Sequence, residues 1–300
     1  MKYFENLTEI YVSIDEFYKK FNQMMKKHQL NPVRRRRNRK YNLSASEVMT
    51  ILVLFHLSDY RHLKHFYLFY VLNHLRSEFP QTVSYNRFVE LSQSVIFPLA
   101  IYLKKQSVGE CTGISFVDST PLRVCHNRRI HSHKVFKGIA QRGHCSIGWF
   151  FGFKLHIIIN DKGELLNFVL TLANVDDREP LIAGNMLKQV WGKLFGDKGY
   201  ISQSLFNTLF VSGIHLITKI RKNMRNTPMN MTDKILLRKR ALIESVNDEL
   251  KNICQIEHSR HRSVINFLTN LLAGLIAYCF LPKKPRIKCE FENSNQLAFC

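Results

Sequence analysis

The stretch KLFGDKGYIS, residues 193–202, decides the fold, because its apolar run stops at Asp197 with glycines on both sides. The same arrangement occurs in GISFVDSTPL, residues 113–122, where the run from Ile114 to Val117 leads into Asp118. Short apolar runs bounded by turn residues are typical of strands buried inside a sheet. The sequence therefore predicts two buried strands that each end in an aspartate.

The segments around these two strands predict an α/β fold. Strands are expected at 113–118, 149–160, 163–174, 193–197 and 214–220, and helices at 176–190, 201–213 and 232–256. The order is three strands followed by alternating helices and strands, which predicts a mixed sheet covered on both faces. This is the order of a ribonuclease-H-like fold.

The first part of the chain has a different pattern, which predicts helices throughout residues 1–105. Ser44 and Glu47 form a capping box ahead of an apolar helical repeat. A run of six Arg and Lys lies between Arg34 and Lys40, and is either an arm that contacts phosphates or a solvated linker. We expect a helical, basic DNA-binding region at 1–105 and a ribonuclease-H-like catalytic domain at 106–300, which includes a C-terminal apolar helix at 264–281.

The charge of the chain indicates a polyanionic partner. Lys and Arg number 44 against 23 Asp and Glu, a formal net charge of +21, and 45% of the residues are apolar. Nucleic acid is the first candidate and an anionic membrane surface the second. The segment 264–281 is shorter than the ~20 residues of a membrane span, so we expect no membrane insertion. The seven cysteines are scattered without paired spacing, which is typical of free thiols in a reducing cytoplasm. The positive charge favours association with the nucleoid.

The two aspartates predict a metal site if their strands are neighbours. Two carboxylates at the ends of neighbouring strands would repel each other unless a cation lay between them. Oxygen ligands select Mg²⁺ or Mn²⁺ rather than zinc. A third carboxylate is expected from the helix at 232–256, where Glu244 shares a face with Arg240 and Lys251. Alternatively, Arg240 and Glu244 form an ordinary surface pair, and the aspartates only cap turns. Asp177 is the substitute if one of the three acids is misassigned.

The motifs VDSTPL, GDKGY and RALIESVNDELK resemble the three acidic motifs of bacterial DDE transposases encoded by insertion sequences. The third is similar to the R-x₃-E-x₆-K signature at Arg240, Glu244 and Lys251, although Leu237 stands where many relatives carry a tyrosine. Further segments between 44 and 281 resemble the insertion sequence nine-eight-two family. The resemblance implies a ribonuclease-H-like core, metal-dependent strand transfer, and Asp118, Asp197 and Glu244 as catalytic metal ligands.

Residues 119–160 contain no acid and follow the first strand directly, which indicates a basic flap over DNA. A solvated loop is the alternative. The expected DNA-binding residues of this segment are Arg123, Arg128, Arg129, Lys134, Lys137, Arg142 and Lys154. Cysteines and histidines between 125 and 145 offer a zinc site, but their spacing lacks the regularity of structural zinc ligands. Residues 219–240 carry eight Lys and Arg against Asp233 alone, and we expect them to face DNA as well.

These observations predict a transposase that binds the ends of its insertion sequence, cuts phosphodiester bonds and joins the freed 3′ hydroxyl ends to target DNA. We expect Mg²⁺ or Mn²⁺ as cofactor and a homo-oligomer on double-stranded DNA. A DNA-binding relative that has lost catalysis, and a nuclease that cleaves without joining, are the alternatives.

Overall fold

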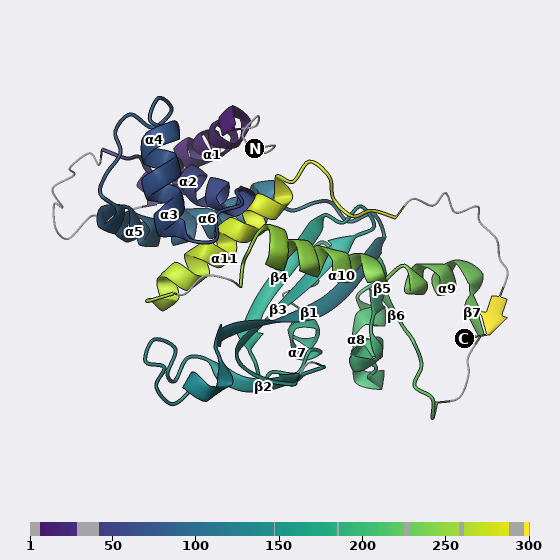
Figure 1. Cartoon of the computed structure of the whole chain (residues 1–300). Coiled ribbons are helices and arrows are strands. Elements are labelled where there is room, and N and C mark those ends of the chain that lie inside the picture. Colours follow the sequence, from purple (N-terminus) through teal and green to yellow (C-terminus); the bar gives the residue numbers. More distant parts are fainter. Residues whose placement is uncertain are drawn as a thin grey trace. The chain divides into compact units, whose positions relative to one another are not determined.

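A computed structural model of the chain describes residues 7–28, 42–146, 148–184, 186–224, 228–257, 261–287 and 297–299. The basic run Arg34–Lys40 lies outside these residues. The chain divides into two compact units, shown with their elements in Figure 1. Unit 1 comprises residues 1–107 and 250–281, and unit 2 comprises residues 108–249 and 282–300.

The described elements of unit 1 are helices. They are α1 (Leu7–His28), α2 (Ala45–Leu57), α3 (Leu63–His65), η2 (Phe66–Val71), α4 (Leu72–His74), α5 (Tyr85–Ser94), α6 (Ile96–Tyr102), η3 (Leu103–Ser107) and α11 (Val264–Cys279), with η6 (Glu249–Ile253) at the boundary. The capping box predicted for α2 is confirmed, because Ser44 Oγ accepts from the N–H of Glu47 and the Glu47 carboxylate accepts from the N–H of Ser44.

Helix α11 belongs to unit 1 by its contacts, although the sequence places it at the end of the catalytic region. It packs against α2, α5 and α6, and Ala273, Leu275 and Tyr278 are buried there. The prediction of a buried helix is thus confirmed, but the helix groups with the N-terminal helices. No helix in the described ranges is both long and apolar enough to cross a membrane.

Unit 2 is built on a mixed sheet. Its strands are β1 (Ile114–Cys125), β2 (Gln141–Cys145), β3 (Gly148–Asn160), β4 (Leu165–Leu172), β5 (Gly192–Gly196) and β6 (Ile214–Thr218). They lie in the order β2-β3-β1-β5-β6, and β4 also pairs with β3. The β1, β5 and β6 strands run parallel, whereas the β3 pairings are antiparallel. A short pair, β7 (Pro228–Asn230) with β8 (Leu297–Phe299), lies apart from this sheet.

The expectation that Asp118 ends its strand is wrong, because β1 continues to Cys125. The reason is that the two edges of β1 have different partners. Its parallel pairing with β5 stops at Phe116, whereas its antiparallel pairing with β3 continues to Cys125. Strand β2 was also missed, since its sequence QRGHC is not apolar.

The helices of unit 2 are shorter than the sequence predicts. They are η4 (Asn127–Arg129), α7 (Glu179–Ile182), η5 (Lys198–Tyr200), α8 (Gln203–Val211), α9 (Met231–Arg238) and α10 (Ala241–Asp248). The long helix expected at 232–256 is broken by a turn at Lys239 and Arg240. The break lets α9 contact β5 and β6 while α10 contacts β1, which one straight helix could not do.

Alternation of side chains along β1 and β5 separates two faces of the sheet. On one face, the rings of Phe116 and Phe195 stack with centroids 5.4 Å apart. The opposite face carries Val117 and Leu194, which join a buried cluster with Leu205 and Leu209 of α8. Helix α10 runs alongside β1 (Figure 1). Asp118 lies two residues beyond Phe116 and therefore shares its face, and it is hydrogen-bonded to Asn247 of α10.

Candidate active site

Asp118 and Asp197 lie at the same level of two adjacent strands. Phe116 pairs with Phe195 in the parallel ladder of β1 and β5, and each aspartate lies two residues further on. Because residues two apart share a face, both aspartates belong to the face that carries the stacked rings. The prediction that their strands are neighbours is therefore confirmed.

Two glycines around Asp197 leave room for this arrangement. Asp197 is the N-cap of η5, and its Oδ1 accepts a 2.8 Å hydrogen bond from the N–H of Gly199. A Cβ at Gly199 would lie 3.0 Å from that same oxygen, and a Cβ at Gly196 would lie 3.1 Å from the ring of Tyr200. The Gly-Asp-Lys-Gly sequence thus fixes the turn that holds this carboxylate.

Helix α10 and its N-cap residue bring two side chains to Asp118 and a third side chain to one of these two. The amide of Asn247 donates to Asp118 Oδ2 over 3.0 Å, and Arg240 Nη1 lies 3.7 Å from Asp118 Oδ1. Arg240 Nη2 also donates to Glu244 Oε1 over 2.8 Å. One guanidinium is therefore shared by two of the three predicted acids, and the i,i+4 pair proposed as the alternative does form. Asn247 was not predicted from the sequence.

Asp118 is an unusually basic carboxylate. The pKa of Asp118 is raised to about 6, chiefly by burial and also by the negative charges of Asp197 and Glu244, against the opposing effects of Arg240 and the N–H of Ser119. Only 21% of its side chain is exposed, compared with 60% for Glu244. A raised pKa in a carboxyl group means that its charge is poorly compensated. An additional cation close to these acids would therefore be stabilising.

The donor set fits a hard divalent ion in its chemistry. Carboxylate oxygens are the ligands that Mg²⁺ prefers, and Asp118 lies within electrostatic reach of both other acids. Among the side chains that the structure describes, no group of three or more His, Cys, Asp or Glu converges closely enough to hold a metal ion. Glu244 is instead paired with Arg240. The three acids share one region without forming a closed cluster, and the described cysteines and histidines of the zinc alternative form none either.

The sequence matches the family model described as a transposase DDE domain, over residues 108–264. This range is just over half of the chain and contains Asp118, Asp197 and Glu244. The chain belongs to this transposase family. It is also similar to the piggyBac transposase in a cryo-EM structure of its synaptic complex with hairpin DNA, with 12% identity, 90% of this chain and 70% of that chain covered, and a TM-score of 0.48. No curated protein matches the chain.

Tyr200 is a buried polar group of the transposase site that the sequence did not indicate. Its side chain is 2% exposed, and its hydroxyl has no hydrogen-bond partner among the described residues. Burial, and then the charges of Asp118, Asp177 and Asp197, raise the pKa of Tyr200 well above its usual value. It therefore stays protonated and neutral.

Lys154 differs from the other predicted DNA-binding residues of the transposase. Its ammonium donates to the Val175 carbonyl and to Asp177, each over 2.9 Å. His156, two residues on, is buried and bonded to Thr171, and burial lowers its pKa to about 4. Asp177, the substitute acid, thus forms an ion pair with Lys154. The contacts of Lys154, His156 and Asp177 are therefore explained by the packing of the fold.

The remaining predicted DNA-binding cations of residues 119–160 lie on the surface of the transposase. Those at positions 123, 128, 129, 134, 137 and 142 are all exposed. Trp149 is 59% exposed, and the guanidinium of Arg142 lies 5.6 Å from the centre of its ring. An exposed, basic surface of this kind is able to contact phosphates.

The last residue of the predicted signature, Lys251, lies in η6 and belongs to unit 1. Its ammonium is 3.3 Å from a carboxylate oxygen of Glu257. Within unit 2, the structure therefore brings Asp118, Asp197, Glu244 and Arg240 into one region. Lys251 belongs to unit 1 and forms an ion pair with Glu257 there.

Proposed function

We propose that this transposase binds the ends of an insertion sequence of the nine-eight-two type, cleaves DNA there, and joins the 3′ hydroxyl ends to target DNA. One observation carries the proposal. Asp118 and Asp197 share a level and a face on adjacent parallel strands, and α10 places Glu244 near them through Arg240. We assign these three acids as the catalytic metal ligands on a ribonuclease-H-like core.

The cofactor in this proposal is Mg²⁺ or Mn²⁺. Divalent ions held by carboxylates supply charge for an attacking and a leaving oxygen in phosphodiester displacement. In cleavage, water adds to phosphorus and the P–O3′ bond breaks, which leaves a 3′ hydroxyl and a 5′ phosphate. In joining, that hydroxyl attacks a target phosphodiester, and a target 3′ hydroxyl leaves.

The protein's own residues have separate tasks in this reaction. Arg240 is shared by Asp118 and Glu244, and its exchange onto a DNA phosphate would release both acids. Asn247 keeps one oxygen of Asp118 in place. The exposed cations between β1 and β3 hold the DNA backbone. Such contacts orient the reacting phosphodiester, which accounts for a large part of the catalysis of phosphoryl transfer.

We further propose that the helical region 1–105 recognises DNA and that the protein acts as a homo-oligomer on double-stranded DNA in the cytoplasm, close to the nucleoid. The net charge of +21 supports a polyanionic partner. Arg240 and Lys251 stay assigned as DNA contacts, since both are cations of the signature helix region.

The test is a cleavage assay with purified protein and DNA that carries the repeats flanking its gene. With Mg²⁺ or Mn²⁺ we expect a nick at the repeat end. Asp118→Asn and Asp197→Asn should abolish it while DNA binding persists, because the charge that holds the ions is lost and the shape is kept. Asp161→Asn, in the loop between β3 and β4, is the matched control and should cleave normally. Full activity of either site variant would exclude the assignment.

A further inference from the structure

A hollow beside Asp197 carries cations and no acid. Its volume is about 250 Å³. The cations that line it are Lys198, Lys219, Lys234 and Arg238, and the apolar lining consists of Ile220, Met229 and Leu237. These residues follow β5 and β6 or belong to β7 and α9.

The hollow adjoins the predicted catalytic edge of the sheet. Gly196 pairs with Thr218 at the last step of the parallel ladder between β5 and β6. Asp197 and Lys219 therefore leave the sheet at the same level, and Lys198 is the next residue after the aspartate. A ligand in the hollow would lie next to any group bound at Asp197.

The absence of acids in the lining has a structural cause. Asp233 is the one acid among residues 219–240, and it is 7% exposed. Its carboxylate is held 2.6 Å from the ammonium of Lys193 on β5, which ties α9 to the sheet. In the part of the chain that the structure describes, Lys198, Lys219 and Arg238 form no ion pair. Their charge is thus available to an anion.

The apolar lining sets this hollow apart from a simple phosphate site. Leu237 is 5% exposed, and Ile220 and Met229 are half-buried. The volume of about 250 Å³ lies just below the range in which small-molecule sites begin, about 300 Å³, so the pocket has room for no more than one nucleotide and excludes a duplex. Cations beside an apolar floor match the two parts of a nucleotide, its phosphate and its base or sugar.

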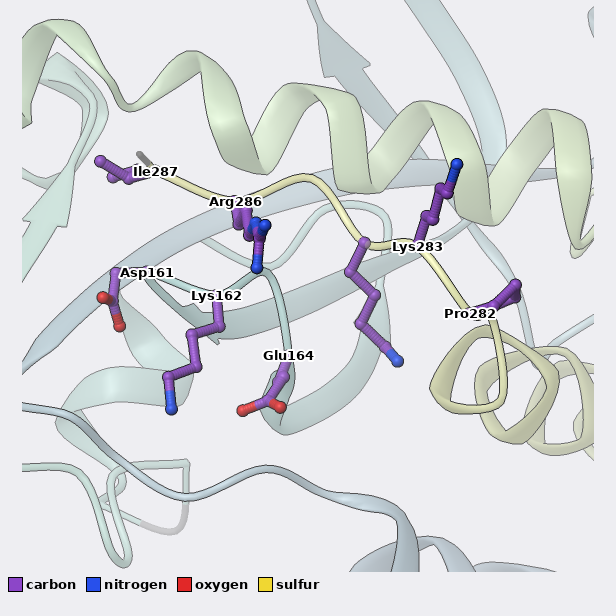
Figure 2. Close-up of a pocket in the computed structure, with 8 residues that line it drawn as sticks. Asp161, Lys162, Glu164, Pro282, Lys283, Arg286 and Ile287 are labelled. Carbon is purple, nitrogen blue, oxygen red and sulfur yellow. The ribbon is translucent and has the colours of Figure 1, made fainter. Parts of the chain in front are cut away.

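A second basic pocket of unit 2 offers a contrast. It is larger, about 950 Å³, and lies between the β3–β4 loop and the segment 282–287 (Figure 2). Lys162, Lys283 and Arg286 line it together with the acids Asp161 and Glu164. Its mixed charges give weaker attraction to a polyanion. The loop follows Asn160, which pairs with Ser115 near the start of β1, away from the end of β5 that carries Asp197.

We propose that the hollow beside Asp197 binds a single nucleotide of the DNA strand that is cut, with its phosphate at Lys198, Lys219 and Arg238 and its base or deoxyribose on the apolar floor. This assignment rests on the proposed function and names the part of the substrate that this side of the site holds. It makes Lys198, Lys219 and Arg238 positioning residues for the neighbouring phosphodiester.

The first test measures DNA affinity without divalent metal, so its readout does not depend on cleavage. Lys219→Ala combined with Arg238→Ala should reduce the slope of log Kd against log salt by about one, because both cations contact the same phosphate and each lost phosphate contact lowers the slope by about one. Lys162→Ala combined with Lys283→Ala is the matched control, with two lysines removed from the pocket of Figure 2, and should leave the slope unchanged. Equal changes in both pairs would overturn the proposal.

The second test detects the base or sugar in the hollow. Protein labelled with ¹³C at the methionine methyl groups is titrated with a single-stranded oligodeoxynucleotide, and Met229→Leu identifies the Met229 signal. We expect that signal to shift with the oligonucleotide and not with inorganic phosphate, and the shift to disappear in Lys219→Ala. DNA that binds without moving the Met229 signal would overturn the nucleotide site alone, whereas failure to bind any DNA would overturn the proposed function as well.

Discussion

The side-chain amide of Asn247 donates a 3.0 Å hydrogen bond to Oδ2 of Asp118 and so joins the C-terminal end of α10 to β1. Asn247 is 9% exposed, so water does not replace this donor readily. The bond fixes the orientation of a carboxylate that we assign as a metal ligand. Outer partners of this kind commonly change metal affinity or activity by about 10- to 100-fold when they are removed.

Asn247→Ala should therefore lower cleavage by about tenfold or more and raise the Mg²⁺ concentration needed for half-maximal activity. A purely structural role would lower the amount of folded protein without moving that metal requirement. Ser245→Ala, at an exposed position of the same helix, should leave both quantities unchanged. An unaltered metal requirement in Asn247→Ala would contradict the positioning role.

Glu244 and Asp248 compete for the role of third acid. Glu244 shares the Arg240 guanidinium with Asp118, whereas Asp248 is exposed one turn further along α10. Glu244→Gln should abolish cleavage and leave DNA affinity nearly intact, because removing a negative charge does not weaken attraction to phosphate. Asp248→Asn should retain most of the activity. The reverse pattern in a cleavage and gel-shift comparison would show that the third acid is misassigned.

His56 makes the stability of unit 1 depend on pH. Burial lowers the pKa of His56 to about 4 from 6.5, against its hydrogen bonds to Cys254 and Asn270. Burial also lowers the pKa of His261 to about 4, and the charge on His56 contributes. Between pH 6.5 and about pH 4, His56 is protonated in the unfolded chain but stays neutral in the folded chain. The free energy of unfolding is therefore highest above pH 6.5 and falls as the pH is lowered to about 4.

The loss for one such histidine is on the order of 3 kcal/mol. Thermal unfolding measured from pH 8 to pH 4 should show it as a falling midpoint. His56→Asn keeps a donor for the Cys254 carbonyl, and it should show a lower midpoint at pH 8 with a shallower decline below pH 6.5. Parallel curves for the two proteins would exclude His56 as a source of the pH dependence.

A fragment of residues 1–107 should not fold on its own. Helix α2 is buried along nearly its whole length, and α11 supplies part of what covers it. Without α11 the apolar surface of α2 meets water, which costs about 25 cal/mol per Å². We expect the fragment to bind a hydrophobic dye and to unfold without a cooperative transition, whereas residues 1–107 linked to 250–281 should unfold cooperatively. A cooperative transition in the short fragment would contradict this.

The sequence predicted those features that depend on local patterns. The capping box of α2 and the apolar runs before Asp118 and Asp197 are local signals, and the structure contains all three. The length of β1 was not predictable in this way, because Ser119, Thr120 and Pro121 resemble a turn and stay extended only through their pairing with β3. No glycine or proline in the sequence marks the break between α9 and α10. The break depends on the tertiary contacts of the two helices, since α9 contacts β5 and β6 whereas α10 contacts β1.

The candidate site was predictable to the same extent. The acids could be found because they interrupt apolar runs in a basic chain. Asn247 and Tyr200 could not, since their importance comes from proximity to Asp118 across the fold. Lys154 was predicted as a DNA contact from charge alone, whereas its ion pair with Asp177 joins residues 23 positions apart and is not a local signal.

The packing of α11 against α2 has a consequence for synthesis on the ribosome. Residues 108–249, which form most of unit 2, leave the ribosome before α11 does. Domains generally fold in the order in which they are made, but here the helices made first lack a neighbour until residue 281 has emerged. The nascent N-terminal segment therefore spends the longest time with apolar surface exposed, and it is the part of the chain on which chaperones would act.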